Sequence, residues 1–217
     1  LSNDAPGNVD LLVELAAGYM RHGNVQGNPT GANLGDRRGA LSSYAKAKEA
    51  LEEALRSQPK HRQALLKTGD LLTTSVYLLE ADGQREASVE MGRKAVAHWE
   101  AMAQYDAKDE IARAGLAGPC FAMASATQLA WDGRMRYWSL AKDAYEEILR
   151  AHPEAASSMR NVALVHKYMS GMYSPGAAPE GKGDLDRALR HAEQAVELDE
   201  RRVEVTSQDA QARLDLA

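Results

Sequence analysis

The segment GDRRGALSSYAKA, residues 35–47, has a counterpart near the other end of the chain, GDLDRALRHAEQA, residues 183–195. The two segments share Gly-Asp, Ala-Leu and a final Ala in register. Glycine followed by a polar residue also occurs at Gly83 and Gly133, so the four glycines are separated by 48, 50 and 50 residues. A fixed period of this kind is typical of repeat proteins, in which each repeat is one supersecondary unit. The spacing therefore predicts four copies of one unit.

Each copy carries a long helical pattern after its glycine. In the first copy, one helical stripe is formed by Leu41, Tyr44, Leu51 and Leu55. In the fourth copy, the equivalent stripe is formed by Leu185, Leu189, Ala192 and Val196. Asp36 and Asp184 precede these helices and are suited to cap free amide groups at a helix start. Turn residues and apolar period thus agree on a helix that begins after each glycine.

These patterns predict an all-α fold, a right-handed superhelical stack of about four long helix pairs with a truncated fifth. We expect a single repeat domain over residues 1–217, with pairs at about 9–57, 60–105, 108–151 and 154–200 and a partial fifth at 203–217. The individual helices are expected at about 9–22, 36–57, 60–81, 84–105, 108–131, 134–151, 154–172 and 184–200. Gly118-Pro119 predicts a kink or a break inside the helix at 108–131.

Small residues inside the helices point to a family. Ala40 and Ala47 are seven residues apart, as are Ala188 and Ala195 in the fourth copy. In the first helix, two large residues are followed by a small residue and a tyrosine; they are Leu12, Leu15, Ala16 and Tyr19. This helix is expected to end at Gly23. This pattern resembles the tetratricopeptide repeat (TPR), in which small residues let two helices cross closely. The period differs, because that repeat has about 34 residues and these units are longer.

A more specific resemblance lies in GNVQGNPTGANLGDRRGALSSYAKA, residues 23–47. This segment is similar to part of the TPR region that follows the catalytic domain in some bacterial serine/threonine protein kinases. The resemblance implies a C-terminal fragment of such a kinase. The fragment itself contains no H-R-D, D-F-G or A-P-E triplet. It is therefore not expected to be an enzyme, and any kinase domain of the parent would precede Leu1.

Composition narrows the class of partner. The net charge is −5 with both signs mixed along the chain, which argues against nucleic-acid binding. Cys120 is the single cysteine, so an internal disulfide and a cysteine-based zinc site are excluded.

The longest uncharged run, residues 114–131, contains Gly, Pro, Ser, Thr and Gln and is expected to be a buried helix, not a membrane-inserted one. The compartment stays open; a cytoplasmic location is favoured, and an extracytoplasmic one would follow from a membrane span upstream in the parent.

The segment GAAPEGKGD, residues 176–184, has the outline of a phosphate-binding loop. Gly183 stands where that motif needs a Ser or Thr to bind magnesium, and Pro179 lacks an amide that could hold phosphate. The segment occupies the same place in its copy as the glycine-rich insertion after residue 23. We therefore interpret it as a connection between two helices.

The sequence offers no catalytic, cofactor-binding or metal-binding residues. The six histidines lack a second histidine at i+3 or i+4 and are expected to be solvated or to cap helices. The three tryptophans are expected to pack between helices; they are Trp99, Trp131 and Trp138.

Two functions remain, with a nucleotide-binding enzyme as a distant third. The first is a protein-interaction module that holds a peptide or partner protein in a concave groove lined by the first helices. Its candidate groove residues are Arg21, Lys67, Asn161, His166 and Lys167. The second is a structural or oligomerising segment of the same parent, which would form a homodimer through an exposed apolar stripe.

Overall fold

The computed structural model describes residues 8–106, 108–206 and 210–216. This part of the chain is 79% helical and contains no strand. The all-α prediction is confirmed. Parts of the predicted domain lie outside the described residues, namely its first seven residues, residue 107 and, in the partial fifth pair, residues 207–209 and 217.

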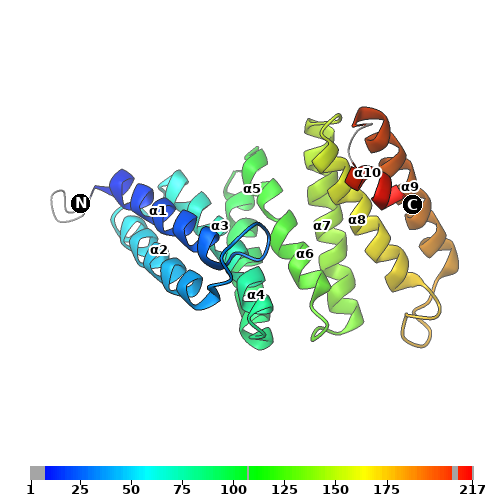
Figure 1. Ribbon diagram of the computed structural model, residues 1–217, viewed down its shortest axis with the longest axis horizontal. Coiled ribbons are helices and arrows are strands. Elements are labelled where there is room, and N and C mark those ends of the chain that lie inside the picture. The colour runs from blue at the N-terminus through cyan, green and yellow to red at the C-terminus, as the bar shows by residue number, and fades with distance from the viewer. Residues whose placement is uncertain (1–7, 107, 207–209, 217) are drawn as a thin grey trace. The chain divides into compact units, whose positions relative to one another are not determined.

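The helices, labelled in Figure 1, group into two compact units by their contacts. The first unit, Leu1–Gly115, contains α1 Val9–Gly27, α2 Arg37–Ser57, α3 Arg62–Ala81, α4 Arg85–Tyr105 and α5 Glu110–Gly115. The second unit, Leu116–Ala217, contains α6 Ala117–Ser125, α7 Trp131–Ala151, α8 Ala156–Tyr173, α9 Leu185–Val205 and α10 Ala210–Leu216. That the whole chain forms one continuous array stays a prediction.

Local sequence signals set several helix starts. The side chains of Asp36 and Asp184 accept hydrogen bonds from the amides of Gly39 and Arg187, so both predicted caps are confirmed. Each cap satisfies one of the amides that have no partner at a helix start. Just before α2, Gly35 has a φ of +78°, a conformation that costs little only for glycine.

The first helix does not close at Gly23 as expected, and α1 continues to Gly27. A side chain at position 23 would collide with the ring of Tyr44 and approach the carbonyl oxygen of Ala40. The glycine therefore allows α1 and α2 to cross closely instead of ending the helix. Local sequence could not distinguish the two roles, because glycine is common both at helix ends and at close crossings.

The third predicted pair differs most from expectation. Its first helix is split at Leu116 into α5 and α6, and residues 126–130 are not helical. Pro119 lies in the first turn of α6, where a missing amide hydrogen costs nothing. Helix α7 then begins at Trp131, so Gly133 lies inside its first turn and does not precede it. The uncharged run 114–131 is thus divided, and none of the helices described is long and apolar enough to cross a membrane.

In the first unit, small residues and one tryptophan hold the helices together. Ala16, Ala40 and Ala47 are fully buried where α1 and α2 meet. Trp99 of α4 is 3% exposed, and its indole nitrogen donates to the Thr73 hydroxyl of α3 at 3.2 Å. The predicted packing role of this tryptophan is confirmed.

Gly69 of α3 and Gly115 of α5 make room for the Trp99 ring, since a side chain at either position would collide with it. We expect Gly69→Ala to lower the free energy of unfolding by about 1–3 kcal/mol, the usual cost of overpacking a core. Gly18→Ala is the matched control, because nothing outside its own stretch of helix backbone lies within 4 Å of the added methyl group. That change should raise stability by about 0.5–1 kcal/mol through helix propensity. Urea unfolding followed by circular dichroism measures both; equal effects of the two changes would contradict the packing argument.

Candidate functional site

The five residues predicted from sequence divide between the two units. Arg21 and Lys67 belong to the first unit, on α1 and α3. Asn161, His166 and Lys167 belong to the second unit, all on α8. Arg21 is exposed, Asn161 is half-buried, and Lys67 forms an ion pair with Asp70 at 3.3 Å. None of these five residues is part of the lining of the two cavities described below.

His166 is 3% exposed, so the expectation of solvated or capping histidines is wrong for this residue. Its Nδ1 lies 2.8 Å from Nδ1 of His191 on α9, and its Nε2 lies 3.7 Å from the Glu146 carboxylate of α7. Burial and the neighbouring His191 lower the pKa of His166 to about 4. His61, by contrast, caps α3 as expected, because its Nδ1 accepts from the Ala64 amide.

Lys167 is held by the protein itself. Its ammonium lies 2.8 Å from Oδ2 of Asp199, a carboxylate that is only 1% exposed, and it also bonds to the backbone oxygen of Asp215. A variant at Lys167 would therefore test the stability of the second unit before it tested ligand binding.

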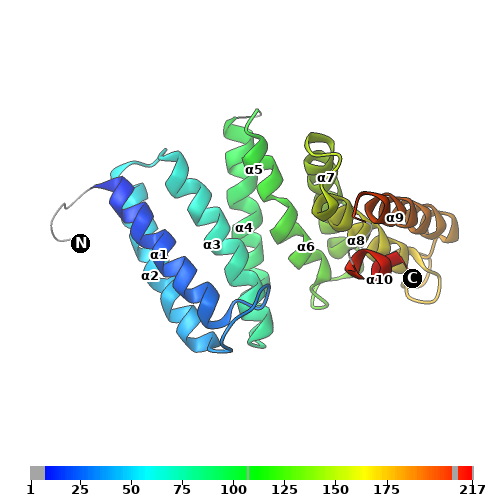
Figure 2. The same cartoon turned by 45° about the horizontal axis from the view of Figure 1, so that its top comes forward.

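The first unit contains an open cavity of about 670 Å³ between α2, α3 and α4, here called the α2–α4 groove. Helix α3 packs against both α2 and α4 and lies between them (Figure 2). Apolar side chains dominate the lining; those that are only half-buried are Leu41, Leu55, Leu72 and Met91. The volume lies in the range of sites that hold ligands in proteins, roughly 300–1,000 Å³.

Charged side chains border this groove from two helices. Lys48 and Glu52 of α2 form an ion pair at 3.5 Å, and Lys94 of α4 pairs with Glu90 at 2.6 Å. All four side chains are more than half exposed to solvent. Such pairs contribute little to stability, because water screens them and long side chains lose entropy. They can exchange partners at small cost when a charged ligand arrives.

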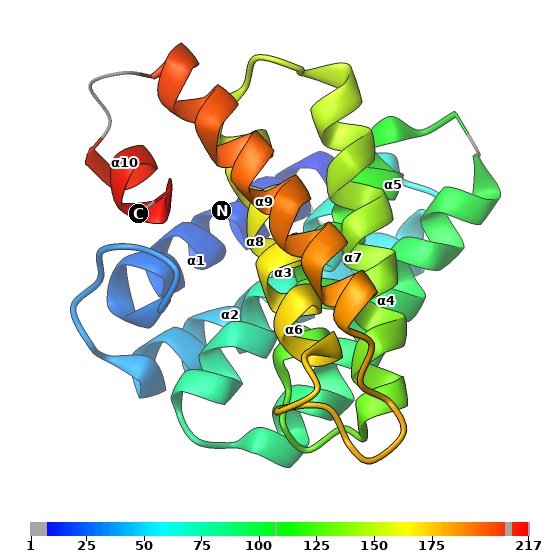
Figure 3. The same ribbon diagram turned by 90° about the vertical axis from the view of Figure 1, so that its right-hand side faces the viewer.

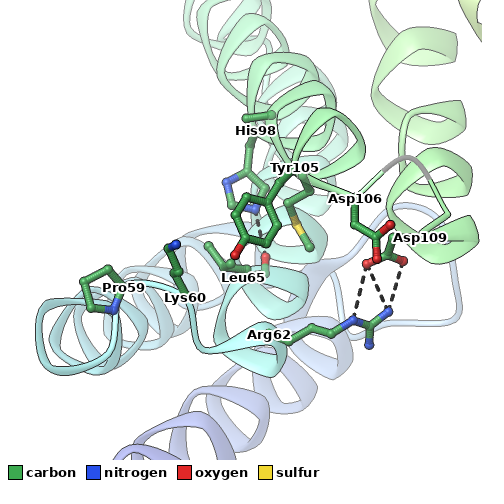
Figure 4. Close-up of a pocket in the computed structure, with 10 residues that line it drawn as sticks. Pro59, Lys60, Arg62, Leu65, His98, Tyr105, Asp106 and Asp109 are labelled. Atoms are coloured by element: carbon green, nitrogen blue, oxygen red, sulfur yellow. Dashed lines mark hydrogen bonds and ion pairs between the residues drawn. The ribbon is translucent and has the colours of Figure 1, made fainter.

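His98 also lines a second cavity of about 310 Å³, here called the Tyr105 pocket. Figure 4 shows Lys60, Leu65, His98 and Tyr105 gathered around it. Nε2 of His98 donates to the carbonyl oxygen of Leu65 at 2.8 Å, so this ring is held in place. The ammonium of Lys60 lies 5.1 Å from the ring centre of Tyr105. The residue Tyr105 is 74% exposed to solvent.

An ion pair closes one edge of the Tyr105 pocket (Figure 4). The guanidinium of Arg62 donates to both carboxylate oxygens of Asp109 at 3.0–3.3 Å. The Ala112 amide and Arg62 lower the pKa of Asp109, and partial burial opposes them. Asp109 also accepts from the Ala112 amide near the start of α5, so this carboxylate links α3 to α5. These bonds involve both of its carboxylate oxygens.

Among the described residues that line the two cavities, the Thr68 and Ser75 hydroxyls donate to backbone oxygens, and the His98 ring donates to the Leu65 carbonyl oxygen. Among the described residues, no group of three or more His, Cys, Asp or Glu side chains could hold a metal ion. Lys182, from the loop that resembles a phosphate site, forms an ion pair with Asp132 at 2.8 Å and lies over the ring of Trp131. These contacts support the interpretation of residues 176–184 as a connection between α8 and α9. The two cavities can offer apolar surface and charge to a ligand.

Sequence reasoning placed the groove on the first helices of the pairs. The α2–α4 groove is lined by one first helix, α3, and by both second helices of the first unit, α2 and α4. A signal for it was present in the apolar stripe of α2. Tyr44 and Leu51 of that stripe are buried, whereas Leu41 and Leu55 are half-buried, and all four line the groove. Periodicity identified the stripe but not which of its members face solvent.

Part of the chain matches a known protein family. A family model described as Tetratricopeptide repeat matches residues 33–75, which include all of α2 and most of α3. No curated protein matches the chain. The match and the all-helical fold together show a TPR-like region. Regions of this kind generally mediate protein–protein interaction and are typically not catalytic.

Proposed function

We propose that this chain is a non-catalytic protein-interaction region that binds an apolar segment of a partner protein in the α2–α4 groove. The observation that supports the proposal is a solvent-open cavity whose half-buried apolar side chains are leucine and methionine. Methionine and leucine side chains adapt to the shape of a partner's apolar residues, and their burial stabilises a complex by about 25 cal/mol per Å².

The charges around the groove indicate an acidic flank on the partner. Two of the three charged residues that line it are Lys48 and Lys94, and the third is Glu52. His98 lies where the groove adjoins the Tyr105 pocket, so one segment could run from one cavity into the other. An extended or helical segment must be ordered on binding, which reduces affinity. We therefore expect a dissociation constant in the micromolar range, roughly −8 kcal/mol.

The link to a serine/threonine kinase is part of the same proposal and is supported by the resemblance of residues 23–47. In that arrangement the region would recruit a substrate or regulator to a catalytic domain encoded upstream of Leu1. Determining the coding sequence upstream of Leu1 tests this link, because a parent without a kinase domain would rule it out. The binding proposal does not depend on the result.

Binding can be tested with a displayed library of random peptides selected on the purified protein. Selected peptides should combine an apolar anchor with acidic residues and should bind with micromolar affinity. Ala97 and Lys94 are exposed residues that line the groove, so Ala97→Glu and Lys94→Glu change its surface without disturbing the core. Each should weaken binding about tenfold or more, equivalent to about 1.4 kcal/mol.

Leu34→Asp is a matched control, because this leucine is 79% exposed on the first unit and lines neither cavity. It should leave affinity unchanged. If the selected peptides bind the Ala97→Glu and Lys94→Glu variants as tightly as the original protein, the groove is not the binding site. Failure to select any peptide, together with a dimer in light scattering, would favour the oligomerising segment instead.

A further inference from the structure

The Tyr105 pocket is formed by three stretches of the first unit, namely the connection between α2 and α3, helix α3 and the C-terminal part of α4. Its volume of about 310 Å³ equals that of about ten water molecules, at roughly 30 Å³ each. A leucine or valine side chain would leave much of this space unfilled, and apolar walls without a contacting atom lose dispersion energy. Aromatic side chains are the largest apolar groups that a protein partner can supply. The volume therefore favours an aromatic occupant.

The walls of this pocket carry groups that attract an aromatic ring. Tyr105 is the last residue of α4, which packs against α5 in the same unit (Figure 3). Because this residue is 74% exposed, its ring can pair edge-to-face or offset-stacked with a second ring. The Lys60 ammonium, 5.1 Å from the Tyr105 ring centre, is a cation that a second aromatic face can also contact. Met102 adds a sulfur atom, which makes favourable contacts with aromatic rings.

The charges at the pocket are balanced, which favours a neutral occupant. Lys60 and Arg62 are positive, and Asp106 and Asp109 are negative. Arg62 and Asp109 bind each other, and Asp106 accepts a hydrogen bond from the Lys108 amide. A charged side chain of either sign would therefore meet attraction and repulsion at the same opening. An aromatic side chain is neutral and avoids this conflict.

Two bonds between helices hold the walls of the pocket in place before a ligand arrives (Figure 4). His98 of α4 donates to the Leu65 carbonyl oxygen of α3, and Arg62 of α3 binds Asp109 next to α5. Walls that are already ordered lose little entropy when the pocket is filled. His98 also lines the α2–α4 groove, so a side chain in the pocket can belong to the same segment that occupies the groove.

We propose that the Tyr105 pocket binds one aromatic side chain of the partner segment that lies in the α2–α4 groove. This inference rests on the proposed function and adds the class of residue that the partner must carry. The partner's ring packs against the Tyr105 ring and contacts the Lys60 ammonium, while the apolar anchor of the segment occupies the groove. Aromatic anchors in well-packed pockets supply much of the binding energy of protein interfaces. The pocket therefore determines which segments bind tightly.

The test uses peptides selected on the purified protein from a displayed random library. The tightest peptides should each carry an aromatic residue at a constant spacing from their apolar anchor. Replacing that aromatic residue with leucine should weaken binding to the original protein about tenfold or more, measured by fluorescence anisotropy. In Tyr105→Ala the aromatic peptide and its leucine version should bind with nearly equal affinity. This variant should stay folded, because Tyr105 is mostly exposed, and circular dichroism checks this.

Lys60→Met removes the ammonium and keeps most of the apolar stem. It should reduce the preference for the aromatic peptide about threefold, as expected for the loss of an exposed cation–π contact. Ile111→Ala is the matched control, because this residue is 56% exposed in the same unit and lines neither cavity. It should keep the full preference.

Two results would overturn this inference and leave the proposed function standing. The first is a peptide that Ala97→Glu weakens but that binds equally well with leucine in place of its aromatic residue. The second is a preference for the aromatic peptide that persists in Tyr105→Ala. Peptides that Ala97→Glu does not weaken would contradict the groove itself, and this inference with it.

Discussion

Replacing Asp199 with alanine is expected to destabilise the protein by about 3–5 kcal/mol, the usual cost of removing one partner of a buried ion pair. Asp199 and Arg202 are each 1% exposed. Oδ1 of Asp199 accepts from the Arg202 guanidinium at 3.1 Å, and Oδ2 lies 2.8 Å from the Lys167 ammonium. Without the carboxylate, Arg202 stays buried with less compensation, and Lys167 loses its ion-pair partner.

The same ion-pair network fixes α10. A second nitrogen of Arg202 donates to Asp215 at 2.8 Å, and Arg160 of α8 donates to the same carboxylate at 2.9 Å. Burial works to raise the pKa of Asp215, but bonds from Arg202, Gln211 and Arg160 lower it to about 2. The Asp199→Ala change should therefore also increase hydrogen exchange in residues 210–216, because Arg202, which binds Asp215 and the backbone of Gln211, would lose one of the partners that hold its guanidinium.

Urea unfolding followed by circular dichroism measures this prediction. Glu200→Ala is the matched control, since Glu200 is the next residue and is exposed; it should change stability by no more than about 0.5 kcal/mol. Replacing both partners with apolar residues, as Asp199→Leu with Arg202→Met, should recover part of the loss, because neither charge then remains buried alone. A loss below about 1 kcal/mol in Asp199→Ala would show that the ion pair is not important for stability.

Acidification from pH 7 to pH 4 is expected to remove about 2–3 kcal/mol of stability through His166. Its pKa of about 4 in the folded protein lies below the ordinary value of 6.5, so between these values the unfolded chain binds more protons than the folded one. The contribution is therefore complete above pH 6.5, is lost progressively as pH falls toward 4, and changes no further below that. Each unit of pKa difference corresponds to about 1.4 kcal/mol.

The physical cause is the burial of two imidazoles against each other. In the hydrogen bond between His166 and His191, one Nδ1 donates and the other accepts, so both rings cannot be protonated there without losing it. Burial also lowers the pKa of His191, as do the charges of Lys142, Arg190 and Arg187. Glu146 acts in the opposite sense on both rings, but more weakly than burial.

The decisive measurement compares free energies of unfolding of the original protein and a His166→Gln, His191→Gln variant over pH 7 to 4. Other carboxylates titrate in both proteins, so the difference between the two curves isolates the histidine pair. The variant should lose less stability on acidification, whereas His152→Gln, at an exposed histidine, should behave like the original. Parallel curves for the original and the double variant would contradict the prediction.

Features that depend on a few neighbouring residues could be predicted from sequence. The aspartate caps connect residues three apart, and the left-handed backbone before α2 needs glycine at Gly35. The existence of long helices follows from apolar residues that recur every three to four positions. Small residues at Ala40 and Ala47 correctly indicated the close crossing of α1 and α2. The family match over residues 33–75 covers part of this same region.

The sequence by itself therefore determined an all-helical, TPR-like repeat and many of its helix starts, because those signals are local. Only the tertiary structure decided what each helix face contacts. In the repeat register, Leu51 and Ala54 of α2 correspond to Asp199 and Arg202 of α9, and all four are buried. Periodicity marks such positions as buried without showing that distant Lys167 and Asp215 compensate the charges there. It likewise cannot show that Leu189 stays exposed, because burial depends on whether another helix covers that face.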